Sequence, residues 1–351
     1  MSSHAPVHRP RRLWVGPAVA LGTAVVLVGV VEVVARTWVV PELLSFLPIY
    51  AADEVAGYRL KSGVDAYAFG ARVRTNSVGF RGPEWSRVPA PGVLRIALIG
   101  DSLAFGFGVA FEQTVGEALA RRIARRCGRA CEVLNFGVPG YNAAQQLAVL
   151  ERLALPFRPQ LVLVLPCSND HEPALWVDDE GAMHWGERGQ PGTHATPRGV
   201  PRRARWGVLR HSGLAVWIKS TWLRWQADRT PVPQGHWMGM LTAGPVPSPI
   251  DQRVLLPLRT MYERCAAQRI PMVVGLFAGD DRYRLALREL VARTGVPALE
   301  LLELFPEAHS WAELCAQFSL GWDSHPNAEA YARWANGLFE LLEKHRLLPS
   351  K

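Results

Sequence analysis

Residues 96–111 read IALIGDSLAFGFGVAF, and this stretch decides the fold of the chain. Aliphatic side chains run directly into Gly100-Asp101-Ser102, and glycines punctuate the turn that follows. A short apolar run that ends in a polar turn is typical of a buried strand in a parallel sheet. The Ser102 hydroxyl either caps the helix that follows or acts as a nucleophile at the carboxyl edge of the sheet, where open α/β folds build their sites.

Apolar runs of strand length alternate with helical periodicity along the chain after residue 93. We expect further strands within residues 131–140, 160–170, 271–279 and 297–305, and helices over residues 112–126, 142–155, 281–294 and 326–345. This alternation is typical of βαβ units, and it predicts an α/β fold with a parallel sheet.

The N-terminus predicts a membrane anchor. Residues 13–31 contain no charged side chain, and the run is about long enough to cross a bilayer as a helix. Basic residues precede it at Arg9, Arg11 and Arg12. We therefore expect a cytoplasmic tail at residues 1–12, a transmembrane helix at residues 13–35 and an extracytoplasmic (periplasmic) remainder. A cleaved signal peptide is one alternative, although no small-residue cleavage site follows. A buried core helix is the other.

The rest of the chain is predicted to form one domain at residues 93–348, preceded by a segment of short strands and turns at residues 36–92. Residues 171–250 interrupt this domain with a stretch rich in Pro, Gly, Arg and Trp. Its tryptophans alternate with basic residues, at Trp206, Trp217, Trp222 and Trp225. Three interpretations of this insertion are considered. In the first it lies on a membrane surface, in the second it covers the site as a lid, and in the third its aromatic side chains pack on the parent domain. We favour the last interpretation.

Composition excludes several classes of site. The net charge of +8 comes from 39 Lys and Arg against 31 Asp and Glu, and the excess is spread along the chain without basic blocks. A nucleic-acid groove is therefore not predicted. Cys127 and Cys131 are spaced for a local disulfide in an oxidising compartment, but this spacing alone is a poor zinc signal. The remaining cysteines, Cys167, Cys265 and Cys315, are expected to be small buried side chains.

Polar residues end several of the predicted strands. Ser102 ends one strand, Gly140 closes the turn after the next, and Asn169-Asp170 ends a third. The sequence DSHPN, residues 323–327, precedes the last helix. Because the carboxyl ends of parallel strands share one edge of the sheet, we expect these segments to converge.

The chemistry of these side chains is complementary. The Ser102 hydroxyl needs a base to take its proton, and His325 is the natural candidate because imidazole titrates near neutral pH. Asp323 is the candidate acid that orients this imidazole. The backbone N–H groups of Ser102 and Gly140 and the amide of Asn169 are candidate donors to an oxyanion. Taken singly, each of these residues also has a structural interpretation as a turn, loop or helix-cap residue.

Together, the segments GDSLAFG, NFGVPGYN, SND and DSHPN resemble the sequence blocks of the SGNH/GDSL hydrolase superfamily. The resemblance carries the nucleophile onto Ser102, the oxyanion residues onto Gly140 and Asn169, and the base onto His325. It implies a three-layer α/β/α flavodoxin-like fold and hydrolysis of carboxylic esters through an acyl-enzyme, without a metal or nucleotide cofactor.

The sequence departs from the family pattern at two positions. Cys167 stands where the third block usually has glycine, and we expect local repacking there. The family's acid usually lies three residues before the histidine, where this chain has Trp322. Asp323 lies two residues before it, so a backbone carbonyl that orients His325 in a Ser-His dyad is the alternative to a triad.

The leading hypothesis is a membrane-anchored, periplasmic serine hydrolase that cleaves O-acyl esters of glycans, lipids or small molecules. An alternative is an O-acyltransferase or deacetylase that acts on cell-envelope or exopolysaccharide glycans. A third hypothesis is a non-catalytic envelope scaffold that binds glycan. A pure binding protein has no need for the serine, glycine, asparagine and histidine together, which argues against it.

Overall fold

A five-stranded sheet with the strand order β11-β10-β7-β5-β6 forms the centre of the molecule. The computed structural model describes residues 15–35, 37, 49–69, 71–178, 183–186, 212–215, 217–218, 251–277, 281–309, 311–320 and 325–349. All ladders of this sheet are parallel. Its strands are β5 (Leu94–Gly100), β6 (Cys131–Asn135), β7 (Leu161–Leu165), β10 (Met272–Leu276) and β11 (Ala298–Glu300). β6 and β7 therefore lie on opposite sides of β5, as in flavodoxin-like sheets.

The central strands are buried on both faces, which is why they read as continuous apolar runs. All residues of β5 and β7 are buried. Ile96 and Leu98 of β5 belong to one hydrophobic core, and Ala97 and Ile99 belong to the other. Successive side chains of a strand point to opposite faces, so one short run supplies both cores.

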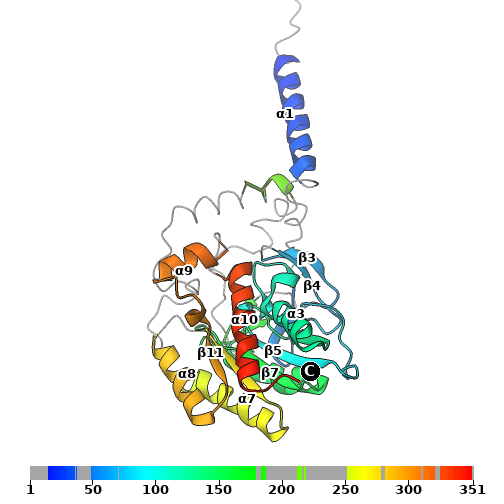
Figure 1. Cartoon of the computed structure of the whole chain (residues 1–351). Helices are drawn as coiled ribbons and strands as arrows, with labels where there is room; N and C mark the ends of the chain where they lie inside the picture. Colours follow the sequence, from blue (N-terminus) through cyan, green and yellow to red (C-terminus); the bar gives the residue numbers. More distant parts are fainter. Residues whose placement is uncertain are drawn as a thin grey trace, which may run out of the picture.

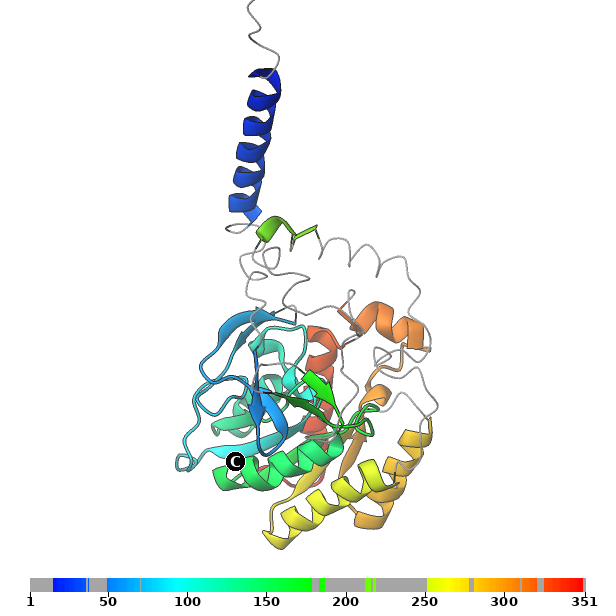
Figure 2. The same cartoon turned by 180° about the vertical axis from the view of Figure 1, so that it is seen from behind.

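Helices cover both faces of the sheet (Figures 1 and 2). One core includes residues of α3 (Val115–Cys127), α9 (Trp311–Phe318) and α10 (Ala328–Lys344). The other includes residues of α4 (Ala143–Val149), α7 (Leu256–Ala267) and α8 (Asp281–Thr294). The three-layer α/β/α fold expected from the sequence is therefore confirmed.

The helix boundaries follow from local capping. The helix expected over residues 281–294 has these bounds. The one expected from residue 112 begins at Val115, because Phe111–Gln113 form a 3-10 turn and the Thr114 side chain caps the next helix. The last helix begins at Ala328 because the Asn327 side chain accepts from the Ala330 N–H. Wider or tighter turns extend α4 at Leu150–Ala154 and Leu155–Phe157 and precede α7 at Asp251–Leu255. A separate 3-10 turn, Leu301–Leu304, follows β11.

The segment before β5 packs into these cores as two hairpins. They are formed by β1 (Tyr50–Asp53) with β2 (Gly57–Leu60), and by β3 (Asp65–Ala68) with β4 (Ala71–Arg74). Tyr58 and Phe80 are fully buried beside the sheet. Leu60, Val73 and Phe105 share a third cluster, which joins the hairpins to the turn after β5. A further hairpin, β8 (Leu175–Val177) with β9 (Met183–Trp185), follows β7.

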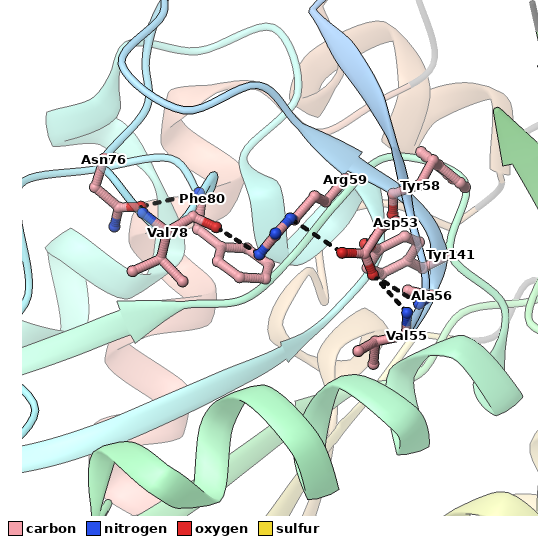
Figure 3. A network of polar contacts seen from close by, with 9 residues as sticks. All are labelled: Asp53, Val55, Ala56, Tyr58, Arg59, Asn76, Val78, Phe80 and Tyr141. Atoms are coloured by element: carbon pink, nitrogen blue, oxygen red, sulfur yellow. Dashed lines mark hydrogen bonds and ion pairs between the residues drawn. The ribbon is translucent and has the colours of Figure 1, made fainter. Parts of the chain in front are cut away.

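A polar network closes the loops of the first hairpin and of the segment that follows β4 (Figure 3). Asp53 Oδ1 accepts from the N–H groups of Val55 and Ala56 at 3.0 and 2.8 Å. Its other oxygen pairs with Arg59 Nε at 3.1 Å, and Arg59 in turn donates to the Val78 carbonyl at 3.0 Å. The two loops are thus fixed to each other through one carboxylate and one guanidinium.

The helix α1 (Val15–Val34) extends away from the rest of the molecule (Figures 1 and 2). Its residues Gly16–Val34 have a mean hydropathy of 2.2 and are unburied, so by length and composition the helix is able to cross a membrane. The carboxylate of Glu32 accepts hydrogen bonds from Ser212 Oγ and from the N–H groups of Gly213 and Leu214 at 2.8–2.9 Å. This contact fixes a short part of the insertion to the end of α1.

The described part of the insertion includes Trp217, one of the four tryptophans named above. Trp217 is 43% exposed, whereas packing on the parent domain was the favoured expectation for the insertion's aromatic side chains. Trp206, Trp222 and Trp225 lie outside the described residues.

All five cysteines are free thiols, so the disulfide considered between Cys127 and Cys131 is not formed. Cys127 ends α3, and Cys131 begins β6 after a turn at Gly128. Cys167, Cys265 and Cys315 are buried, as expected from their apolar surroundings.

Candidate active site

Ser102 lies at the carboxyl end of β5, at the start of the short helix α2 (Ser102–Phe105). The cap of this helix is Asp101, whose Oδ1 accepts from the Leu103 N–H at 2.9 Å. The Ser102 hydroxyl is thus not needed as a cap. Its Oγ lies 2.8 Å from Nε2 of His325 and 3.2 Å from Oδ2 of Asp101. The imidazole is therefore the closer partner of the hydroxyl.

The His325 backbone is held by the segment before it. Leu320 donates its N–H to the His325 carbonyl at 3.0 Å, and Asn327 donates its N–H to the Phe318 carbonyl at 2.9 Å. The His325 ring stacks on Phe107, with centroids 4.1 Å apart and an interplanar angle of 21°. Asp323, the predicted acid, lies outside the described residues.

The strand order explains why distant loops meet at Ser102. β5 lies between β6 and β7, so the loop after β6, which carries Gly140, and the loop after β7, which carries Asn169, flank the end of β5. In flavodoxin-like sheets the chain passes from one side of the first strand to the other at this point. The carboxyl end of that strand, here β5, is the topological switch point where ligands bind. The predicted site residues within the described part of the chain therefore share one edge of the sheet.

The loop that carries Gly140 is held close to α2. Asn135 Nδ2 donates to the Ala104 carbonyl at 2.7 Å, and Tyr58 Oη donates to the Pro139 carbonyl at 2.8 Å. Gly140 has φ +87°, and a Cβ at this position would lie 2.9 Å from Tyr58 Oη. Any other residue would be strained here and would clash with the tyrosine, so the position requires glycine.

The loop that carries Asn169 is organised by the buried carboxylate of Asp170. Asp170 Oδ2 accepts from the Cys167 N–H at 2.9 Å, and Oδ1 accepts from Gln146 Nε2 at 2.7 Å. Tyr283 Oη donates to Asp170 at 3.3 Å. Burial and the nearby charge of Asp101 raise the pKa of Asp170 well above its usual value. These contacts of the Asp170 carboxylate thus fix the conformation of the loop that carries Asn169.

Asp101 is the acidic side chain next to the Ser102–His325 pair, and it is fully buried. Burial raises the pKa of Asp101, while hydrogen bonds from Leu103, Asn169 and Ser102 and the charge of His325 oppose this increase. The side chain of Asn169 thus interacts with the residue that precedes Ser102. Asn169 itself is 7% exposed, so its amide lies in a largely water-excluded part of the site.

Glu172 is a third carboxylate near the site, after Asp101 and Asp170. Burial, and then the charge of Asp101, raise the pKa of Glu172 to about 7. Its Oε1 is buried and has no hydrogen-bond partner among the described residues. This side chain therefore titrates near neutral pH.

Several residues of the site were not among those predicted: Asp101, Phe107, Tyr58 and Glu172. Asp101 is adjacent to Ser102, and because aspartate and serine are both common N-cap types, the sequence alone did not decide which of them caps the helix. Tyr58 lies 81 positions from Pro139, and no local pattern links them. Among the residues that the structure describes, no group of three or more His, Cys, Asp or Glu side chains is arranged to hold a metal ion.

Comparison with known proteins assigns the part of the chain that carries these residues to a family. A model of the GDSL-like Lipase/Acylhydrolase family matches residues 98–333, a range that includes Ser102, Gly140, Asn169 and His325. No curated protein is similar enough to count as a match.

Similar solved structures include a putative lipolytic protein of the G-D-S-L family from Desulfitobacterium hafniense, with 12% identity over 71% of this chain and 99% of that chain, and a TM-score of 0.42. The psychrotrophic esterase EstA from Pseudoalteromonas has 12% identity over 72% and 98% of the two chains, and a TM-score of 0.42. The lipase/acylhydrolase from Enterococcus faecalis has 14% identity over 74% and 98%, and a TM-score of 0.40.

Proposed function

The chain belongs to the GDSL-like lipase/acylhydrolase family of ester hydrolases, and from this premise we propose that it is a membrane-anchored, extracytoplasmic serine hydrolase that cleaves O-acyl esters through an acyl-enzyme. The observation that carries the proposal is the 2.8 Å distance between Ser102 Oγ and His325 Nε2. A serine with a base at this distance is the arrangement that nucleophilic catalysis needs.

In the proposed reaction His325 takes the Ser102 proton as Oγ attacks the ester carbonyl carbon. The resulting oxyanion accepts hydrogen bonds from the N–H groups of Ser102 and Gly140 and from the Asn169 amide. His325 then gives its proton to the departing alcohol, which leaves an acyl group on Ser102. Water, activated by the same imidazole, releases the acid and restores the serine. Asp323 is the proposed acid that orients the imidazole.

The proposal is tested with the full-length protein in detergent micelles and an alkyl fluorophosphonate, which reacts with activated serines. We expect a stoichiometric adduct on the peptide that contains Ser102 and a parallel loss of p-nitrophenyl acetate hydrolysis. The Ser102→Ala protein is the control and should carry no adduct on that peptide. A wild-type protein that is neither labelled at Ser102 nor active on acetyl, butyryl or longer-chain esters would overturn the proposal.

The proposed membrane orientation is supported by α1 and by the basic residues that precede it. A single cysteine introduced by Ser350→Cys should react with a membrane-impermeant maleimide in intact spheroplasts. A cysteine introduced by Ser2→Cys should react only after lysis, and the unmodified chain serves as the background control because its own cysteines are mostly buried. The reverse labelling pattern would contradict the orientation.

A further inference from the structure

The orientation of the His325 ring is not set by its own torsion preferences. The torsion between a tetrahedral carbon and an aromatic ring has broad energy minima, so an imidazole turns easily unless neighbouring groups hold it. A turn of this ring would move Nε2 away from Ser102 Oγ, to which it is 2.8 Å distant. The group on the face of the ring is Phe107, at 4.1 Å and nearly parallel. Phe107 is therefore placed to restrict that turn.

The position of Phe107 is itself built into the turn after α2. Its N–H donates to the Ser102 carbonyl at 3.1 Å. The flanking residues Gly106 and Gly108 both have φ +79°, a conformation that glycine adopts without strain. A Cβ on Gly108 would lie only 2.0 Å from Leu320 Cδ1. Since Leu320 also holds the His325 carbonyl, the same turn supports both the ring and the backbone of the histidine.

Phe107 also contacts Phe69, from the β3–β4 hairpin. The Phe69 ring lies 4.9 Å from Phe107 and 5.6 Å from Phe105. Phe69 directly follows Ala68, the last residue of β3, which pairs with Ala71 of β4. Its φ is +55°, a region that bulky residues rarely adopt. Such an outlier persists only where surrounding contacts hold it, and here those contacts lead to the candidate base.

We propose that Phe107 is a positioning residue for His325, and that Phe69 holds Phe107 against the imidazole. This inference rests on the proposed function, because it assigns His325 the role of base. It makes the segment between the anchor and β5 a part of the catalytic machinery. The ring contacts from Phe69 to Phe107 and from Phe107 to His325 then connect a hairpin near the N-terminus to a histidine near the C-terminus.

The test compares ring-deleting and ring-preserving variants of the full-length protein. Phe107→Leu keeps an apolar side chain but removes the ring face, and it should lower kcat by about 10- to 100-fold with little change in KM. The rate of fluorophosphonate labelling of Ser102 should fall by a similar factor. Phe107→Tyr keeps the ring and should retain kcat within about threefold of the wild-type value. Phe69→Leu should reduce kcat in the same direction by a smaller factor.

Phe157→Leu is the matched control for loss of a buried ring. Phe157 is 1% exposed, and its carbonyl accepts from Arg95 near the beginning of β5, which is the opposite edge of the sheet from Ser102. It should lower the melting temperature without changing kcat. A folded Phe107→Leu protein with kcat and labelling rate near those of the wild type would overturn the proposal, as would a Phe107→Tyr protein as impaired as Phe107→Leu.

A crystal structure of Phe107→Leu gives a readout that does not require ester hydrolysis. We expect the imidazole to turn so that the Oγ–Nε2 contact is lost. An unchanged contact would contradict the positioning role, even if the proposed reaction itself proved wrong. Conversely, a turned imidazole in the Phe107→Leu crystal, together with a wild-type protein whose Ser102 does not react with the fluorophosphonate, would support the ring contacts and overturn the ester hydrolysis.

Discussion

Ser102→Ala and His325→Ala are each expected to lower kcat/KM for an activated ester by roughly 10⁴-fold or more, and the double variant no further than either single variant. The reason is the direct contact of 2.8 Å between Oγ and Nε2. A serine without its base is a weak nucleophile, and a base without its serine has nothing to activate. Because the two side chains act together, removal of either one removes the contribution of both.

The measurement is the initial rate of p-nitrophenyl ester hydrolysis by the full-length proteins, with circular dichroism to establish that each variant is folded. Ser77→Ala and His309→Ala are matched controls, because both side chains are exposed and neither is part of the site. Each should keep near wild-type activity. Additive losses in the double variant would mean that Ser102 and His325 act in separate steps, and a small loss in either single variant would remove that residue from the reaction.

The second large effect concerns stability. Arg81→Met is expected to lower the free energy of unfolding by about 3–5 kcal/mol. Arg81 is 1% exposed, and its guanidinium donates to the carbonyl groups of Phe105, Gly106, Val109 and Arg72. Methionine fills much of the same space but donates nothing, so these buried acceptors would lose their partner. Burial lowers the pKa of Arg81 to about 10, which leaves the side chain charged at neutral pH.

Thermal unfolding followed by tryptophan fluorescence measures this effect, with Arg72→Met as the control. Arg72 is exposed and pairs with Asp65 on the surface, and such pairs contribute about 1 kcal/mol or less. Arg81→Lys should have a melting temperature close to that of Arg81→Met, because an ammonium group does not reproduce the planar set of donors. Equal melting temperatures for the Arg81→Met and Arg72→Met proteins would refute the structural role of the buried guanidinium.

The parallel sheet and the convergence of the candidate site residues at one edge of it were predictable because both follow from local patterns. The residues 96–102 already combine a run buried on both faces with a polar end, and the topology then brings the other strand ends to the same place. The choice between Asp101 and Ser102 as the cap was not predictable. Both residue types cap helices, and only the backbone geometry decides which side chain reaches the free N–H.

The segment before β5 was the least predictable part. Its strands span only four residues each, and its contacts are made with residues far along the chain, such as Tyr58 with Tyr141. Arg81 and Arg95 are fully buried there and at the start of β5, against the usual preference of arginine for the surface. Contacts between residues so far apart in the sequence leave no periodic pattern from which they could be predicted. The acid position at Asp323 stays a prediction.

The contact between Glu32 and the insertion bears on how the enzyme is prepared. A secreted version that starts just after the hydrophobic helix would lack the carboxylate that accepts from Ser212, Gly213 and Leu214. Those donors would then face solvent, and the start of that short helical turn would lose its cap. Rates measured on such a truncated protein would therefore describe an enzyme in which residues 212–214 lack their partner carboxylate. A comparison with the full-length chain, reconstituted in lipid, isolates what this contact contributes.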